Sequence, residues 1–170
     1  MKPIILILAA GLALSGCVAR TPGAQLGPDG QAAPVAYTIN ATEAAAMPNR
    51  VLTQMNILRS GSGAAPLALD PALNAAAAAH SRDMAAQNRA WHFGSDGSSP
   101  LERARRAGYS GHIVGENISE SYENDITTLQ AWMETRDTRD VIMDPTATTL
   151  GFAWYQEPSK KIWWTLITGK

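Results

Sequence analysis

The hydrophobic pattern of this chain changes period along its length, and this change limits the fold more than any other feature. Residues 150–156 and 161–168 are rich in Trp, Tyr, Ile and Thr, which favour strands, and residues 157–160 supply a Pro-containing turn between them. We expect an antiparallel hairpin here, with residues 114–119 as a third strand. Upstream of residue 114 the apolar residues instead recur at helical spacing.

Two helices are predicted in the first half of the chain. The first begins at Pro48 and ends at Gly61-Ser-Gly63, and the second follows an Asp70 cap, has Pro71 in its first turn and runs to about Gln87. Their predicted buried stripes are Val51, Met55 and Leu58 in the first helix, and Leu73, Ala77, His80 and Met84 in the second. A buried imidazole needs a hydrogen-bond partner, so we interpret His80 as a structural histidine, with a ligand role as the alternative.

Two shorter helices are predicted further along. Ser99-Pro-Leu-Glu102 has the pattern of a capping box with Pro at the first helical position, so a short helix should run to about Ala107. Another begins near Asn124 or Asp125 and ends near Thr135. Helices on both faces of a small antiparallel sheet make an α+β fold, an α-β-α sandwich.

The N-terminal residues predict export. Residues 1–17 carry one Lys and an apolar run, Ile4 to Leu14, that is too short to span a bilayer, as in a signal peptide. Leu14-Ser-Gly-Cys17 resembles a bacterial lipobox, in which Cys17 becomes the acylated first residue of the mature protein. We therefore predict that this protein meets the membrane through lipidated Cys17, carrying palmitate or a similar chain; the alternative is a plain signal peptide with an incidental Cys.

The remaining organisation follows from composition. Cys17 is the only cysteine, so the domain has no intrachain disulfide and depends on packing. Val18, by resemblance to Gram-negative lipoproteins, favours the outer membrane, with the protein facing the periplasm. Residues 18–42 are rich in Ala, Pro, Gly and Gln and predict a flexible tether, which leaves 43–170 as a single domain.

Charge excludes one class of partner. The formal net charge is -1, and the basic residues form no stripe along the sequence. A nucleic-acid-binding protein needs such a stripe to neutralise phosphates, so we predict no nucleic acid as a partner.

An imidazole and a carboxylate lie in turn-rich passages on either side of the predicted helix at 99–107. His92 precedes a Gly and Asp-Gly turn, and Glu116 lies within a Gly-Glu-Asn-Ile motif. We interpret them as one wall of a surface cleft, the candidate ligand-binding and catalytic site; the alternative is that they belong to a hydrogen-bond network that only fixes the loops of this cleft. Asn117 and Trp91 are predicted to line the same cleft.

Several short motifs, taken in order, resemble a known family. They are Asn56-x-x-Arg59, Pro66-Leu67, Asp70-Pro71-x-Leu73, His80-Ser-x-Asp-Met-Ala85, His92 with its turn, Gly108-Tyr109, Gly115-Glu-Asn-Ile118 and Trp132-Met133. Across about 43–170 their order and spacing resemble the CAP superfamily (cysteine-rich secretory proteins, antigen 5 and pathogenesis-related proteins; SCP-like), in its compact bacterial branch. The resemblance implies the same α-β-α sandwich.

The resemblance also implies a metal-binding cleft in some members, built from two histidines and acidic residues. His92 matches the first histidine and Glu116 the acid, but Thr138 stands where the bacterial pattern has its second histidine. A hydroxyl does not replace imidazole as a zinc ligand, so we predict no metal and no cofactor. His112 is the one candidate to replace the missing second histidine, because on an extended strand it would share a face with Glu116. The alternative is that His112 is an exposed loop residue. We carry no family role onto Glu134.

These observations predict an exported, lipid-anchored module with a degenerate His/Glu cleft that binds a glycan, a peptidoglycan fragment or an apolar small ligand. Trp163 and Trp164 alternate across a strand, so at most one of them belongs to the core of a given face. We expect most of the five tryptophans to pack between the sheet and the helices; the alternative is an exposed indole, which would suit such ligands. Recognition of another envelope protein is a further alternative. So is a peptidase-like or cell-wall-acting hydrolase using His92 and Glu116, although no Gly-x-Ser-x-Gly or His-Glu-x-x-His motif occurs.

Overall fold

Five helices and four strands make up residues 36–170, the part of the chain that this computed structural model describes. The predicted signal peptide, Cys17 and most of the predicted tether lie outside the described residues. No helix within 36–170 is both long enough and apolar enough to cross a membrane. In chain order the elements are α1 (Ala41–Gly61), β1 (Ala68–Leu69), α2 (Pro71–Gln87), α3 (Pro100–Arg106), β2 (Ile113–Ser121), α4 (Asp125–Glu134), α5 (Arg136–Met143), β3 (Thr149–Gln156) and β4 (Ile162–Gly169).

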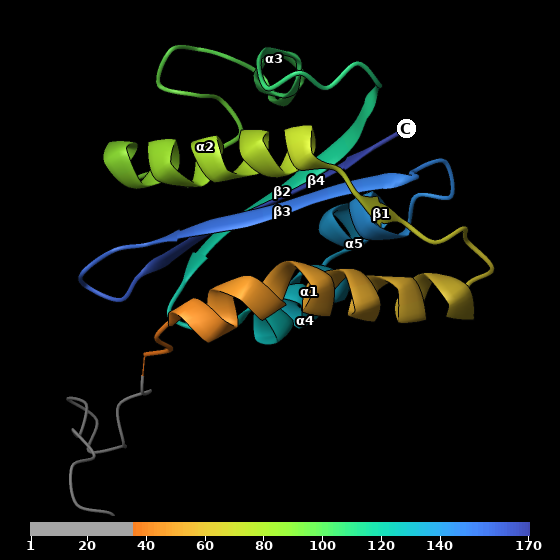
Figure 1. The fold of residues 1–170 in the computed structure, drawn as a ribbon, viewed down its shortest axis with the longest axis horizontal. Helices are drawn as coiled ribbons and strands as arrows, with labels where there is room; N and C mark the ends of the chain where they lie inside the picture. Colours follow the sequence, from red (N-terminus) through yellow and green to blue (C-terminus); the bar gives the residue numbers. More distant parts are fainter. Residues whose placement is uncertain (1–35) are drawn as a thin grey trace, which may run out of the picture. The chain divides into compact units, whose positions relative to one another are not determined.

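The four strands form one sheet in the order β1-β3-β4-β2 (Figure 1). β3 and β4 pair as an antiparallel hairpin, and β2 pairs antiparallel with β4, as predicted. β1 adds a short parallel pairing with β3, so the sheet is mixed rather than purely antiparallel. A two-residue strand is too short to show an alternating pattern, which is why the sequence did not predict it.

Helices cover both faces of this sheet. α2 and α3 lie on one face, and α1, α4 and α5 lie on the other (Figure 1), which confirms the α-β-α sandwich. Every residue of the inner strand β4 is buried, and neither Trp163 nor Trp164 has exposed surface. Both tryptophans are buried because each face of the strand has its own helical layer, as expected for tryptophans that pack between the sheet and the helices.

The face under α1, α4 and α5 carries a core of long and aromatic side chains. Phe152 stacks on Trp164 with ring centroids 5.8 Å apart. Arg59 of α1 is fully buried on this side. Its guanidinium donates to four backbone carbonyls, those of Ala65, Ile142, Asp144 and Ala147. The charge is thus solvated by peptide groups instead of water, and it fixes α1 to the segment after α5.

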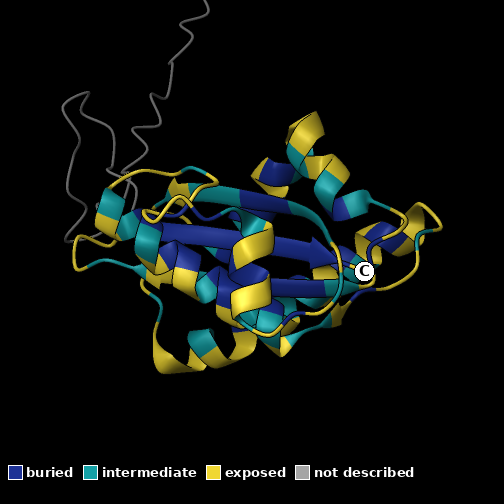
Figure 2. Ribbon diagram, turned by 90° about the horizontal axis from the view of Figure 1, so that it is seen from above, coloured by how far each residue is buried: buried dark blue, intermediate teal, exposed yellow. Residues whose placement is uncertain are grey.

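The face under α2 and α3 carries a smaller core that consists mainly of alanine. α2 approaches β3 so closely that a Cβ on Gly151 would lie 2.3 Å from the backbone carbon of Leu73. Figure 2 shows the buried residues concentrated in the strands, with exposed residues on the outer sides of the helices. The buried members of this core are Leu73, Ala76, Ala77, Ala104, Tyr109, Ala153 and Ile167.

α1 differs from its prediction at its start and in its stripe. It begins at Ala41 after an Asn40 cap, and Pro48 lies inside it rather than opening it. Leu58 is 38% exposed, while Arg59 is buried in its place. The sequence did not predict that Arg59 is buried in place of Leu58, because the periodicity of apolar residues does not identify a buried arginine.

The first described residues, 36–42, belong to the folded domain and not to the predicted tether. The Tyr37 amide donates to the Tyr122 carbonyl at 2.9 Å, and the Ile39 amide donates to Gln156 Oε1 at 2.9 Å. These contacts pair the segment with residues far along the chain, which no local sequence signal reveals.

The other predicted helices begin at the expected caps. Asp70 caps α2, Asn124 caps α4, and Ser99 with Glu102 forms the capping box of α3. α5 was not predicted. It follows α4 almost directly, and Ile142 is its one buried residue, so its apolar pattern is too sparse to stand out.

Candidate functional site

The loop between α2 and α3, α3 itself and β2 bring the site residues together. α2 ends at Asn88, whose left-handed backbone (φ 49°) redirects the chain into the loop that carries His92. The turn predicted after His92 is formed, with the Gly97 amide donating to the Gly94 carbonyl at 2.9 Å. Gly97 has φ +79°, a conformation that favours glycine.

Glu116 of β2 is the buried centre of the site, with only 2% of its side chain exposed. Oε1 lies 2.9 Å from His92 Nδ1, and Oε2 accepts a hydrogen bond from Arg103 Nη2 at 2.6 Å. Both carboxylate oxygens therefore have a partner, and the guanidinium offsets the cost of burying the negative charge.

His92 is the exposed member, with 52% of its side chain open to solvent. A carboxylate only accepts hydrogen bonds, so the contact with Glu116 assigns the proton to Nδ1. In the neutral ring Nε2 is then an acceptor with a fixed orientation. The arrangement suits either hydrogen bonding to a ligand or proton abstraction.

Arg103 of α3 is a site residue that the sequence did not predict. Its side chain is 7% exposed, and besides Glu116 it donates through Nη1 to the carbonyls of His92 and Ser98 at 2.9 and 2.8 Å. One guanidinium thus holds both the carboxylate and the loop. The sequence does contain a signal, because this Arg lies next to Ala104 on the side of a capped helix that faces the sheet.

His80 lies behind the pair and is fully buried, as predicted. Its Nε2 donates to the Trp91 carbonyl at 2.9 Å and lies 3.9 Å from Glu116 Oε1, while its Nδ1 has no hydrogen-bond partner in the described part of the chain. Burial lowers the pKa of His80, although the Glu116 carboxylate opposes this. The ring is therefore neutral at pH 7 and supports the loop through Trp91.

Asn117 does not join the cleft. Successive residues of a strand point to opposite faces, and the Asn117 side chain donates to the Thr138 carbonyl of α5 at 2.8 Å. Glu116 instead faces α3 on the other side of the sheet. The prediction that both line one pocket was wrong because the motif grouped neighbours that the strand separates.

Trp91 contributes its backbone to the site and its indole to the surface around it. The indole Nε1 donates to Gln87 at 3.0 Å, the Arg89 guanidinium lies 3.8 Å from the ring centroid, and Phe93 packs at 5.6 Å. Phe93 is 48% exposed. An aromatic and cationic patch, defined by Arg89, Trp91 and Phe93, therefore flanks His92 along the chain.

The residues present do not fit a metal centre of the kind that the resemblance implies. Within 36–170 no three His, Cys, Asp or Glu side chains converge. Thr138, at the second-histidine position, uses its hydroxyl to donate to the Trp132 carbonyl at 2.6 Å. It stabilises the start of α5 and is not directed to Glu116.

His112, the candidate replacement for the missing histidine, and Glu134, which was given no role, both lie elsewhere. His112 is exposed, and a register shift between Ile113 and Gly115 breaks the two-residue alternation, so His112 does not share the face of Glu116. The idea that it replaces the missing histidine was wrong for this reason. Glu134 is exposed at the end of α4, beside a groove between α1 and α4.

The chain is similar to proteins of one family. The family model described as the cysteine-rich secretory protein family (CAP) matches residues 52–167. An uncharacterized protein of Bacillus subtilis (strain 168), YkwD, is 30% identical over 121 residues, which are 71% of this chain and 46% of that relative. The chain thus spans less than half the length of this curated relative.

Two solved structures share the fold. An extracellular protein containing an SCP domain from Bacillus anthracis has a TM-score of 0.66 and 22% identity, over 79% of this chain and 45% of that one. An outer surface protein from Borrelia burgdorferi has a TM-score of 0.65 and 13% identity, over 80% of this chain and 98% of that one. Together with the family match over most of its length, this likeness shows that the chain belongs to the CAP family of cysteine-rich secretory proteins.

Proposed function

We propose that this chain is an exported CAP module that binds a ligand at the exposed nitrogen of His92. The supporting observation is that buried Glu116, itself paired with Arg103, holds His92 Nδ1 while half of the imidazole remains open to solvent. Nε2 is therefore a preoriented acceptor for an N–H or O–H group. Because the ring is already ordered, a ligand gains this hydrogen bond without the entropic cost of fixing the side chain.

The patch of Arg89, Trp91 and Phe93 favours a glycan or peptidoglycan fragment as the ligand. Sugar rings stack on exposed aromatic faces, and their hydroxyl and acetamido groups donate hydrogen bonds. An apolar lipid, the other class considered from the sequence, would leave the polar edge of His92 without a partner.

Titration of the full chain with oligomers of N-acetylglucosamine and with soluble muropeptides tests this proposal. Calorimetry should give saturable binding that is weakened about tenfold by His92→Ala and by Phe93→Ala, since each removes one contact worth about 1.4 kcal/mol. His112→Ala, an exposed histidine outside the site, is the matched control and should bind like the unaltered chain. Equal affinity of all three variants would contradict the site.

A hydrolase is the second candidate, because the contact between His92 and Glu116 also orients a general base. In that case Nε2 would take a proton from water as the water attacks the substrate, and Glu116 would stabilise the resulting imidazolium. No serine hydroxyl of residues 36–170 hydrogen-bonds to His92, so water is the nucleophile that the arrangement allows. Glu116→Gln separates the two functions, since it should abolish turnover of a labelled muropeptide while ligand affinity falls only modestly.

Export and anchoring are proposed from Cys17 and the apolar run before it. The two structural relatives are described as extracellular and outer surface proteins, which supports export. Metabolic labelling with a clickable palmitate should tag the chain, and Cys17→Ser should remove the tag and release the protein from the membrane fraction. A Cys17→Ser chain that stays with the membrane would contradict the anchor.

A further inference from the structure

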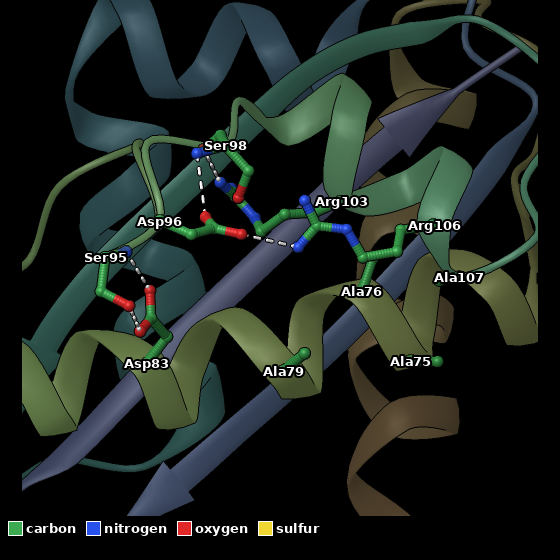
Figure 3. A pocket seen from close by; sticks show the side chains of 10 residues that line it. All are labelled: Ala75, Ala76, Ala79, Asp83, Ser95, Asp96, Ser98, Arg103, Arg106 and Ala107. Atoms are coloured by element: carbon green, nitrogen blue, oxygen red, sulfur yellow. Dashed lines mark hydrogen bonds and ion pairs between the residues drawn. The ribbon is translucent and has the colours of Figure 1, made fainter.

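A pocket separate from the exposed edge of His92 lies between α2, α3 and the loop at 95–98 (Figure 3). It has a volume of about 390 Å³, which falls in the range of small-molecule sites. Its apolar surface is formed by four small side chains, those of Ala75, Ala76, Ala79 and Ala107. Groups of methyl size fit against such a surface, whereas the lining contains no aromatic ring on which a sugar would stack.

The polar groups of the pocket are charged, and both signs are present. Asp83 lies on α2 and accepts hydrogen bonds from the Ser95 amide and hydroxyl at 2.8 and 2.6 Å and from Gln87 Nε2 at 2.9 Å. Asp96 accepts from Arg106 at 2.8 Å (Figure 3). These contacts fix the position of the Asp83 carboxylate but do not neutralise it, because Ser95 and Gln87 are uncharged. Asp83 therefore remains a receptor for a cation.

Arg103 supplies the second observation that indicates a ligand. It lines this pocket and is 7% exposed, and its two terminal nitrogens are used by Glu116, His92 and Ser98. Its Nε carries an N–H with no partner among the described residues. Buried N–H groups are almost always satisfied, so an acceptor is expected here.

We propose that this pocket binds a short peptide with small side chains, its ammonium group at Asp83 and a carbonyl or carboxylate oxygen at Arg103 and Arg106. A simple anion would be repelled by Asp83 and Asp96, and a metal ion by the two arginines. A zwitterion with methyl-sized side chains satisfies both signs of charge and the alanine surface together. This proposal does not depend on the ligand of His92.

Trialanine is the probe, titrated into the full chain by calorimetry and by two-dimensional amide NMR. We expect saturable binding with shifts confined to α2, residues 95–98 and α3. Ala79→Leu fills the pocket from an exposed position on α2 and should weaken binding about tenfold or more, while Ala86→Leu, at an exposed position on the same helix but outside the pocket, should not. His92→Ala should also leave trialanine binding unchanged, which separates this site from the proposed function.

N-acetyl-trialanine tests the assigned orientation. It lacks the ammonium group, so the unaltered chain should bind it more weakly than trialanine. Asp83→Asn should not weaken the binding of N-acetyl-trialanine further, because the contact with Asp83 is already lost. No saturable binding of trialanine, or equal affinity in Ala79→Leu, would overturn the proposal and indicate that a water molecule satisfies Arg103 Nε. Thermal unfolding of each variant shows that it is folded.

Discussion

The two faces of the sheet each bury a guanidinium, and they do so in different ways. On the face of α1, α4 and α5, Arg59 donates to four backbone carbonyls and forms no ion pair with a carboxylate of residues 36–170. On the face of α2 and α3, Arg103 is paired with Glu116, and His80 and His92 lie beside them. The first arrangement fixes backbone to backbone, while the second fixes titratable side chains next to solvent.

The core side chains around the two arginines also differ in size. Arg59 lies beside a core of aromatic and long aliphatic residues, and Arg103 lies beside a core made largely of alanine. Small residues let α2 approach the sheet closely and leave room at its edge for charged groups and a pocket. We infer that stability comes mainly from the first face and ligand chemistry from the second, and four measurements test this division.

Arg59→Ala should have the largest effect. It removes the guanidinium donor from four carbonyls, two of them in fully buried hydrogen bonds, and removes the link between α1 and the segment after α5. We therefore expect a loss of about 3–5 kcal/mol in the free energy of unfolding. Urea denaturation measures it. Arg136→Ala, at an arginine that is 84% exposed, is the control and should have little effect. If Arg59→Ala destabilises the domain as little as Arg136→Ala does, the inference that stability comes mainly from the face of α1, α4 and α5 is wrong.

Arg103→Met should cost about 3 kcal/mol, because it leaves Glu116 buried without its positive partner. Adding Glu116→Gln removes the unpaired charge, so the double variant should recover at least about half of this loss while ligand binding at His92 stays impaired. The same urea experiment completes the double-mutant cycle. The 2.6 Å contact indicates that the two residues are coupled. Additive losses of stability in the two single variants would contradict this coupling.

Gly151→Ala tests how closely α2 lies against the sheet. The added methyl group would meet the Leu73 backbone, which cannot rotate away, and we expect a loss of about 1–3 kcal/mol. Gly61→Ala is the matched control, since no atom lies within 4 Å of a Cβ there. Equal melting temperatures for the two variants would show that the α2 face is loosely packed.

The pH dependence of His80 should be the smallest effect. Its pKa is lowered in the folded state, so the unfolded chain binds the additional proton, and stability is fully present above about pH 6.5 and decreases as the pH falls towards the folded-state value. Denaturation between pH 7.5 and 5 should show this slope in a His92→Gln background. Adding His80→Gln should flatten it, whereas adding His112→Gln, at an exposed ring, should not.

The sequence predicts what depends on neighbours along the chain and misses what depends on contacts across it. The caps at Asp70 and Ser99, the start of α4 near Asn124 and the β3–β4 hairpin are local, and all were predicted. The family motif identified His92 and Glu116 as neighbours, and they are in contact. β1 and the pairing of Arg103 with Glu116 need partners distant in sequence, so no local pattern contains them.

The irregularity between Ile113 and Gly115 has a consequence for how molecules of this protein meet one another. β2 is an edge strand of the sheet, and an edge strand presents unpaired amide and carbonyl groups to a strand from another molecule. A bulge disrupts the regular spacing of these groups and increases the twist of the strand. The bulge that turns His112 away from the site should therefore also disfavour pairing with another molecule at this end of β2.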